Sequence, residues 1–137
     1  MSTLHLTALK AGLDAVLALG TPKLVFMSTS YTPSATTHAY YSDISASVAS
    51  GTTAVTLSGV TTTLDSGNAR VEFDTADPSL STVTASTNKY CIYVDTSNAA
   101  TSPVIATIDI VEGTLSPVSG TLAITVNAEG HFALKAV

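Results

Sequence analysis

Charged residues are scarce in this sequence of 137 residues: they make up 11% of the chain, against roughly 25% in a typical soluble domain. Ten acidic and five basic residues give a net charge of −5. The basic residues are scattered singly, at Lys10, Lys23, Arg70, Lys89 and Lys135. Because a nucleic-acid binder needs clustered lysine and arginine to replace counterions, we expect no direct binding of DNA or RNA.

Cysteine and long apolar runs are also nearly absent. The single cysteine, Cys91, excludes an internal disulfide framework, and its place in an apolar run predicts a buried structural thiol in a reducing compartment. The apolar run at residues 4–19 is broken by His5, Lys10 and Asp14 and follows no positive cluster. It is too short and too polar for a membrane span and makes a poor signal peptide, so we expect synthesis in the cytoplasm without an export signal or a membrane contact.

Motifs that carry chemistry are lacking as well. No serine lies in Gly-x-Ser-x-Gly, and no glycine-rich phosphate loop occurs. The histidines have no paired spacing of the zinc-ligand kind, and the turn aspartates lack the calcium-loop pattern and are expected to cap local backbone. The residues weighed as ligands are His5, His38, His131, Asp65, Asp74 and Asp77. We predict no enzyme, no catalytic residue, no metal and no cofactor; a hydrolase built from dispersed residues is the alternative.

The chain is rich in apolar residues and in residues with a hydroxyl group, where a typical soluble domain has more charged residues. Hydrophobic residues make up 45% of the chain, which is enough for the core of one domain of this length and speaks against disorder. Threonine, which favours strands, and serine, which favours turns, are the abundant polar residues. Such a surface is typical of a protein packed against neighbours or of a secreted-type β domain, and composition alone leaves both open.

Residues 4–19 are the one predicted helix, because their leucines and valine recur every three or four positions. This helix either packs on the sheet of its own domain or serves as an arm that docks on a neighbouring subunit. The residues that carry the prediction are Leu6, Leu9, Leu13, Val16 and Leu17 for the stripe, Ser2 or Thr3 for the cap, and Gly20 and Pro22 for the stop.

The strongest strand signal lies in residues 88–111, where two alternating apolar runs flank a small polar loop. We predict an antiparallel hairpin in which the first run buries one face. Lys89 then lies opposite Asp109, an opposite-charge pair worth about 0.2–1 kcal/mol that helps to fix the register. The other predicted pairs are Tyr90 with Ile108, Ile92 with Ala106, Val94 with Val104 and Asp95 with Pro103.

The rest of the chain predicts short strands separated by turns. Together with the central hairpin they give about eight strands, at residues 24–27, 54–57, 70–74, 80–85, 89–95, 103–111, 121–126 and 131–135. We expect the last two to form a hairpin around residues 127–130. The predicted fold is mainly β: a single antiparallel β-sandwich or barrel-like domain over residues 1–137, with an N-terminal helix or arm at 1–20 and the body at 21–137.

Residues 30–43 are predicted to be a long loop that carries Tyr31, Tyr40 and Tyr41. Loops of this length are often functional or interfacial. The three tyrosines are the candidates for stacking on a sugar, and the alternative is that they fill a protein interface with their hydroxyls at its rim.

Four segments resemble a family of short virion proteins of tailed bacteriophages: residues 93–96 (YVDT), 100–109 (ATSPVIATID), 120–126 (GTLAITV) and 38–44 (HAYYSDI). The chain departs from the family in the hydroxyl-rich residues 45–88 and in the Ser/Thr/Ala-rich tail, where the family tends to be more aromatic. The resemblance implies an N-terminal helix, a β-rich body and a structural role in the particle.

From this resemblance we expect a capsid decoration (auxiliary or cement) protein of the virion. It would bind the major capsid protein on the outer surface of the shell, stabilise the shell, and form a homo-oligomer, with a trimer favoured. The alternatives are a structural protein of the neck or tail, or a carbohydrate-binding module displayed on the virion.

Overall fold

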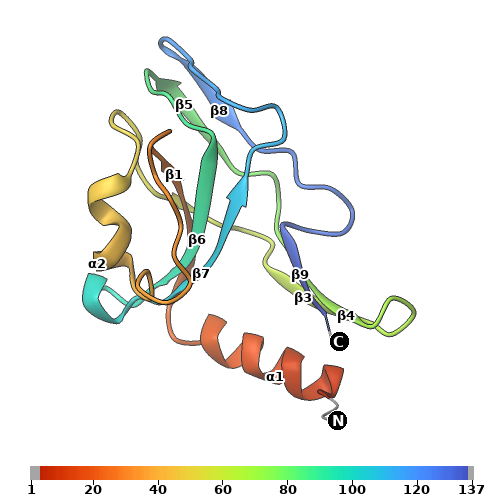
Figure 1. The fold of residues 1–137 in the computed structure, drawn as a ribbon. Coiled ribbons are helices and arrows are strands. Elements are labelled where there is room, and N and C mark those ends of the chain that lie inside the picture. The colour runs from red at the N-terminus through yellow and green to blue at the C-terminus, as the bar shows by residue number, and fades with distance from the viewer. Residues whose placement is uncertain (1–3, 136–137) are drawn as a thin grey trace.

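The computed structural model describes residues 4–135, in which one long helix is followed by nine short strands (Figure 1). The helices are α1 (Leu6–Leu17) and α2 (Tyr41–Ile44), with short 3-10 turns at Ser45–Ser47 and Ala99–Thr101. The strands are β1 (Thr21–Met27), β2 (Val55–Thr56), β3 (Thr61–Asp65), β4 (Arg70–Asp74), β5 (Ser79–Val83), β6 (Lys89–Asp95), β7 (Val104–Asp109), β8 (Gly120–Ala123) and β9 (Phe132–Lys135).

The strands form three antiparallel sheets with the orders β2-β1-β6-β7, β3-β4-β9 and β5-β8. The two smaller sheets pack on one face of the four-stranded sheet, and within residues 4–135 the sheets do not close into a barrel. The predicted mainly β, sandwich-like class with one N-terminal helix is therefore confirmed.

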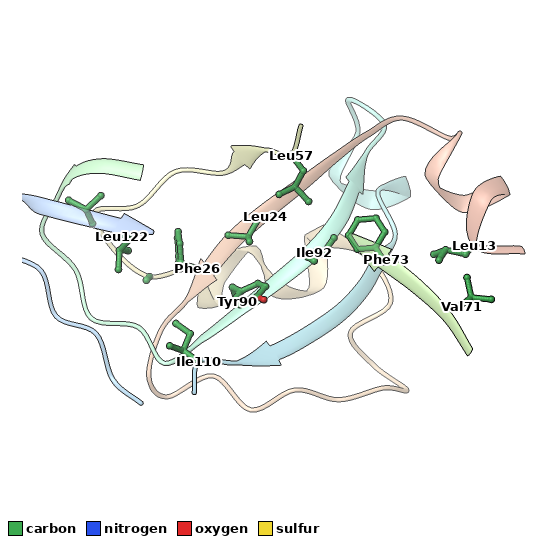
Figure 2. Packing of buried hydrophobic residues seen from close by; sticks show 12 residues of the cluster. Leu13, Leu24, Phe26, Leu57, Val71, Phe73, Tyr90, Ile92, Ile110 and Leu122 are labelled. Atoms are coloured by element: carbon green, nitrogen blue, oxygen red, sulfur yellow. The ribbon is translucent and has the colours of Figure 1, made fainter. Parts of the chain in front are cut away.

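The main core fills the space between these sheets. Figure 2 shows Leu24 from β1 and Tyr90 and Ile92 from β6 in its middle, with Phe73 of β4 at one side and Leu122 of β8 at the far end. Full burial of a side chain of this size contributes about 1.5–3 kcal/mol. Because residues from all three sheets share this core, the strands belong to one packing unit.

Strand β6 lies at the centre of the large sheet, between β1 and β7, and both of its faces are buried. Tyr90 and Ile92 face the main core, whereas Cys91 and Tyr93 face a second cluster beneath the segment that carries α2. The buried structural thiol is confirmed. The prediction of one buried face was wrong, because that segment covers the second face and contains a short helix instead of a structureless loop.

The predicted register of the central hairpin holds over most of its length. Lys89 pairs with Asp109, and Tyr90 with Ile108 and Ile92 with Ala106 follow as predicted. Beyond Ile92 the register shifts and Tyr93 pairs with Val104, so the predicted pairing of Val94 with Val104 was wrong. The β-bulge that causes this shift adds one residue to β7 and has no signature in the apolar pattern.

The predicted hairpin of residues 121–126 and 131–135 was also wrong. Strand β8 pairs with β5, where Leu122 lies opposite Leu80, and β9 pairs with β4, where Phe132 lies opposite Phe73. The Phe73 and Phe132 rings stack with their centroids 5.1 Å apart. Pairing with apolar partners on β5 and β4 therefore stabilises β8 and β9 more than a hairpin between these two strands would.

Helix α1 packs on its own domain, against β3 and β4. Leu13 is only 6% exposed and reaches the main core, and the Thr62 hydroxyl on β3 donates a hydrogen bond to the Asp14 carboxylate at 2.5 Å. The helix begins with His5 as its N-cap, without a side-chain cap, while the predicted caps Ser2 and Thr3 lie outside the described residues.

Candidate protein-docking groove

The three tyrosines of the predicted loop do not share one surface. Tyr31 is 5% exposed and stacks on His38, with which its hydroxyl makes a 3.1 Å hydrogen bond to Nδ1. Tyr41 stacks on Tyr93 with ring centroids 4.4 Å apart. Only Tyr40, at 45%, is well exposed. Two of the three rings therefore pack in or against the second cluster, so the tyrosines do not form a shared surface on which a sugar could stack.

Asp65 and Asp74 cap local backbone amides, as predicted for the turn aspartates, whereas Asp77 binds a distant amide, so its predicted local cap was wrong. Asp65 accepts a hydrogen bond from the Asn68 amide, Asp74 from the Thr75 amide, and Asp77 from the Val126 amide. The side chain of Asn68, followed by its backbone amide, lowers the pKa of Asp65. Within residues 4–135 no three histidine, cysteine or acidic side chains come together as a metal site would require.

His131 is one of the residues that line a cavity of mixed polar and apolar character, about 510 Å³ in volume, between β7, β8 and residues 124–130. Its Nδ1 is 3.0 Å from the Tyr90 hydroxyl and its Nε2 is 2.8 Å from the Thr75 hydroxyl. Burial lowers the pKa of His131, partly offset by Asp74 and Asp77, and burial raises the pKa of Tyr90 to about 12. The sequence places these three residues too far apart for their pattern to have predicted the cluster.

A second cavity, of about 450 Å³, is an apolar groove between α1 and the start of β7. Figure 1 shows α1, in red, running below β7 and β9. Within the part of the chain that the structure describes, the residues that line this groove are all apolar or glycine: Leu4, Ala8, Leu9, Gly12, Leu13, Val16, Pro103, Val104, Ile105 and Leu134. A continuous apolar hollow of this kind on a surface is typical of a protein-docking or ligand site.

The helix wall of the groove is kept open by small residues. Ala8 and Gly12 lie one turn apart and both are exposed, and a side chain added at Gly12 would meet nothing within 4 Å. The two charged residues of α1, Lys10 and Asp14, pair with each other at 2.7 Å and do not line the groove. The hydrogen bond from Lys10, followed by that from the Thr62 hydroxyl, lowers the pKa of Asp14.

The apolar stripe of the helix predicted either packing on its own sheet or docking of an arm on a neighbouring subunit, and it did not predict a groove beside the stripe. The spacing of Ala8 and Gly12 could have indicated the groove. These two small residues lie beside the apolar stripe of the helix and leave room for a partner. Since α1 has 12 residues, no helix in the described part of the chain is long enough and apolar enough to cross a membrane.

Comparison of the chain with protein-family models, with curated proteins and with solved structures gives no match in any of the three. The candidate site therefore rests on its own geometry: an apolar groove beside an outer strand of the sheet.

Proposed function

We propose that this chain is a structural component of a tailed-bacteriophage particle, a capsid decoration protein that binds the outer surface of the major capsid shell and stabilises it. The observation that carries the proposal is the apolar groove between α1 and β7. A valine- or leucine-sized side chain of the shell protein, fully buried there, would contribute about 1.5–3 kcal/mol.

The low charge of the chain and its resemblance to short virion proteins support the same role. Surfaces with few ions pack against neighbours without the desolvation cost of burying charge. As a decoration protein the chain would reside in the virion and form a homo-oligomer, with a trimer as the favoured state at symmetric positions. Equilibrium sedimentation of the purified chain measures that oligomeric state directly.

Counting the copies in purified particles by quantitative mass spectrometry tests the role. A decoration protein should be present at a copy number of the same order as the shell protein. A copy number that matches one ring at the neck or tail would overturn decoration and support the neck or tail alternative.

A pair of helix variants tests the groove. Gly12→Asp places a carboxylate in the groove, whereas Ala11→Asp places the same carboxylate at a neighbouring exposed position that does not line it. We expect Gly12→Asp to weaken co-sedimentation with undecorated shells at least about tenfold, or 1.4 kcal/mol, and Ala11→Asp to leave it nearly unchanged. Equal binding of the two variants would exclude the groove as the contact.

The carbohydrate-binding alternative has less support in the structure, because Tyr31 stacks on His38 and Tyr41 on Tyr93, which leaves only Tyr40 well exposed among the three tyrosines. Glycan-array binding that disappears in Tyr40→Ala would nevertheless revive it, and a blank array would count against it.

A further inference from the structure

Strand β7 forms one edge of the four-stranded sheet, and its hydrogen-bonding pattern shows which of its groups face outward. The Ile110 amide donates to the Asn88 carbonyl at 2.9 Å, which makes this opposed pair a hydrogen-bonded one. Hydrogen-bonded and non-hydrogen-bonded pairs alternate along an antiparallel ladder. Ile108 therefore bonds to β6, while the amide and carbonyl groups of Thr107 and Asp109 point away from the sheet.

The chain covers only the beginning of this edge. The Val104 amide donates to the Ala39 carbonyl at 3.0 Å, and the Tyr41 amide donates to the Ser102 carbonyl at 2.8 Å. Among residues 4–135, no further backbone hydrogen bond of this kind covers the edge beyond Val104. Residues 105–109, with the sequence IATID, contain no proline or lysine of the kind that usually blocks an exposed edge.

The cavity that contains His131 reaches Ile108 and Asp109 of this open edge, and two further cavities border it from the two faces of the sheet. The apolar groove lies on the α1 side, and a cavity of about 440 Å³ lies on the side of residues 31–39. Val104 and Ile105 line both cavities. A strand added at the edge would therefore find room for its side chains on both faces, with its apolar ones directed into the groove.

The negative charge of Asp109, at the far end of the edge, favours a partner strand that carries a basic residue. The Asp109 side chain is 83% exposed, and its neighbour on β6, Lys89, approaches it only to 3.8 Å. A lysine or arginine opposite Asp109 on an added strand would form a cross-strand pair of opposite charge.

We propose that β7 accepts an extended segment of a different protein as an added antiparallel strand. Its basic residue would lie beside Asp109, and its valine or isoleucine side chains would enter the groove between α1 and β7. Strand addition of this kind takes affinity from main-chain hydrogen bonds and specificity from pockets for alternate side chains. This inference rests on the proposed function in one respect: if the chain is a decoration protein, the added segment belongs to the shell protein.

A second copy of this chain fits the edge less well. Two β7 strands paired about Thr107 would place each Asp109 opposite the apolar Ile105. Pairing nearer the end of the strand brings the two Asp109 carboxylates together, which is destabilising. Pairing nearer its beginning collides with residues 39–41, which already bond to that part.

Hydrogen exchange on the full chain tests the proposal with a defined probe, the capped peptide Lys-Val-Thr-Val-Thr, which spans the open residues 105–109. In the free protein the Thr107 and Asp109 amides should exchange fast and the Ile108 amide slowly. With the peptide present, we expect the first two to slow at least about tenfold. No slowing at millimolar peptide, or slowing caused only by raising the concentration of the chain itself, would overturn the proposal, the latter in favour of a second copy.

Two sets of variants separate backbone pairing from other effects. Thr107→Pro removes the outward amide and is compatible with an edge position, whereas Thr107→Val keeps that amide and loses only the hydroxyl. We expect the proline variant, once circular dichroism shows it folded, to lose peptide binding about tenfold or more relative to the valine variant. Asp109→Lys should reverse the preference between this peptide and its glutamate-led counterpart. Equal binding by the proline and valine variants would exclude strand addition.

Failure here and failure of the proposed function can be told apart. If the copy number in particles matches the shell and Thr107→Pro decorates shells as well as Thr107→Val does, the decoration role stands and only strand addition is lost. If the peptide binds as expected but particles hold a single ring of copies, strand addition stands and decoration is lost.

Discussion

The Tyr90 hydroxyl lies 3.0 Å from Nδ1 of His131, and this contact joins the central strand β6 to the start of β9. On the other side of the ring, Nε2 lies 2.8 Å from the Thr75 hydroxyl, which donates its own hydrogen to the Ala76 carbonyl at 2.8 Å. Since a hydroxyl has one hydrogen to donate, Nε2 must be the donor to Thr75. In its neutral form, His131 with its hydrogen on Nε2 accepts from the Tyr90 hydroxyl at Nδ1.

This arrangement predicts a loss of stability in mild acid. Burial lowers the pKa of His131 below its ordinary 6.5, although Asp74 and Asp77 oppose the shift. The unfolded chain therefore binds a proton at a higher pH than the folded chain does. The contribution of His131 to stability is full above about pH 6.5 and is lost as the pH falls through the lower folded pKa.

Urea unfolding between pH 7.5 and 5 measures this effect, because the free energy of unfolding should fall as the pH is lowered. His131→Gln should flatten the pH dependence in this range while lowering stability at pH 7.5. Tyr90→Phe is the control that keeps the titrating ring. An unchanged slope in His131→Gln would assign the acid sensitivity to other groups.

Two glycines with the same backbone conformation predict very different costs of substitution. Gly130 and Gly113 have φ angles of +86° and +84°. A Cβ at Gly130 would collide with the Phe73 carbonyl oxygen, whereas a Cβ at Gly113 meets nothing within 4 Å. Gly113→Ala should therefore cost only the left-handed strain of about 1–2 kcal/mol, while Gly130→Ala should cost clearly more because β4 must move.

Equilibrium urea unfolding of the two alanine variants gives this comparison. The difference between them isolates the steric contact, since the backbone strain is shared. Equal losses of stability would show that residues 127–130 shift away from β4 at little cost.

The elements that were predicted correctly from the sequence are those whose structure depends on residues close together in the chain or on a pair of opposite charges. The alternation in residues 89–95 and 104–109 predicts the central hairpin, and the opposite charges of Lys89 and Asp109 predict its register. The local cap predicted for Asp65 is also present, because its carboxylate accepts from the Asn68 amide. In each case the partners lie close together in the chain or are marked by charge.

What the sequence did not predict depends on contacts between distant segments. Strand β3 (Thr61–Asp65) is rich in threonine and has little apolar alternation, and it becomes a strand because β4 pairs with it. The groove arises from the docking of α1 beside Pro103 and Ile105, which no local pattern specifies. The cluster of His131, Tyr90 and Thr75 likewise exists only once three separate segments have packed.

A matched pair of leucines tests how firmly α1 belongs to the domain. Leu13 is 6% exposed and reaches the main core, whereas Leu19, just beyond the helix, is 60% exposed. Leu13→Ala should destabilise the chain by about 2–5 kcal/mol because it leaves a cavity between α1 and β4. Leu19→Ala should change stability by less than about 0.5 kcal/mol. Thermal unfolding followed by circular dichroism measures both, and a small loss in Leu13→Ala would show that α1 contributes little to the domain.

The single thiol gives a direct probe of how often the sheet opens. Cys91 is fully buried at the centre of β6, its Sγ lies 3.2 Å from the Thr107 hydroxyl, and burial raises the pKa of the thiol. Because the thiolate is the reactive form, burial slows alkylation both by blocking access and by keeping the thiol protonated. We expect a maleimide to label the folded chain at pH 7 far more slowly than the urea-unfolded chain.

The labelling rate should rise with urea in step with the equilibrium population of the opened form, as long as the sheet closes again faster than the reagent reacts. Thr107→Val is the informative control, since it removes the hydroxyl beside Sγ without uncovering the thiol. A rate in native buffer close to that of the unfolded chain would mean that β6 is exposed by local opening. The segment carrying α2, which covers this face of the sheet, would then be the part that opens.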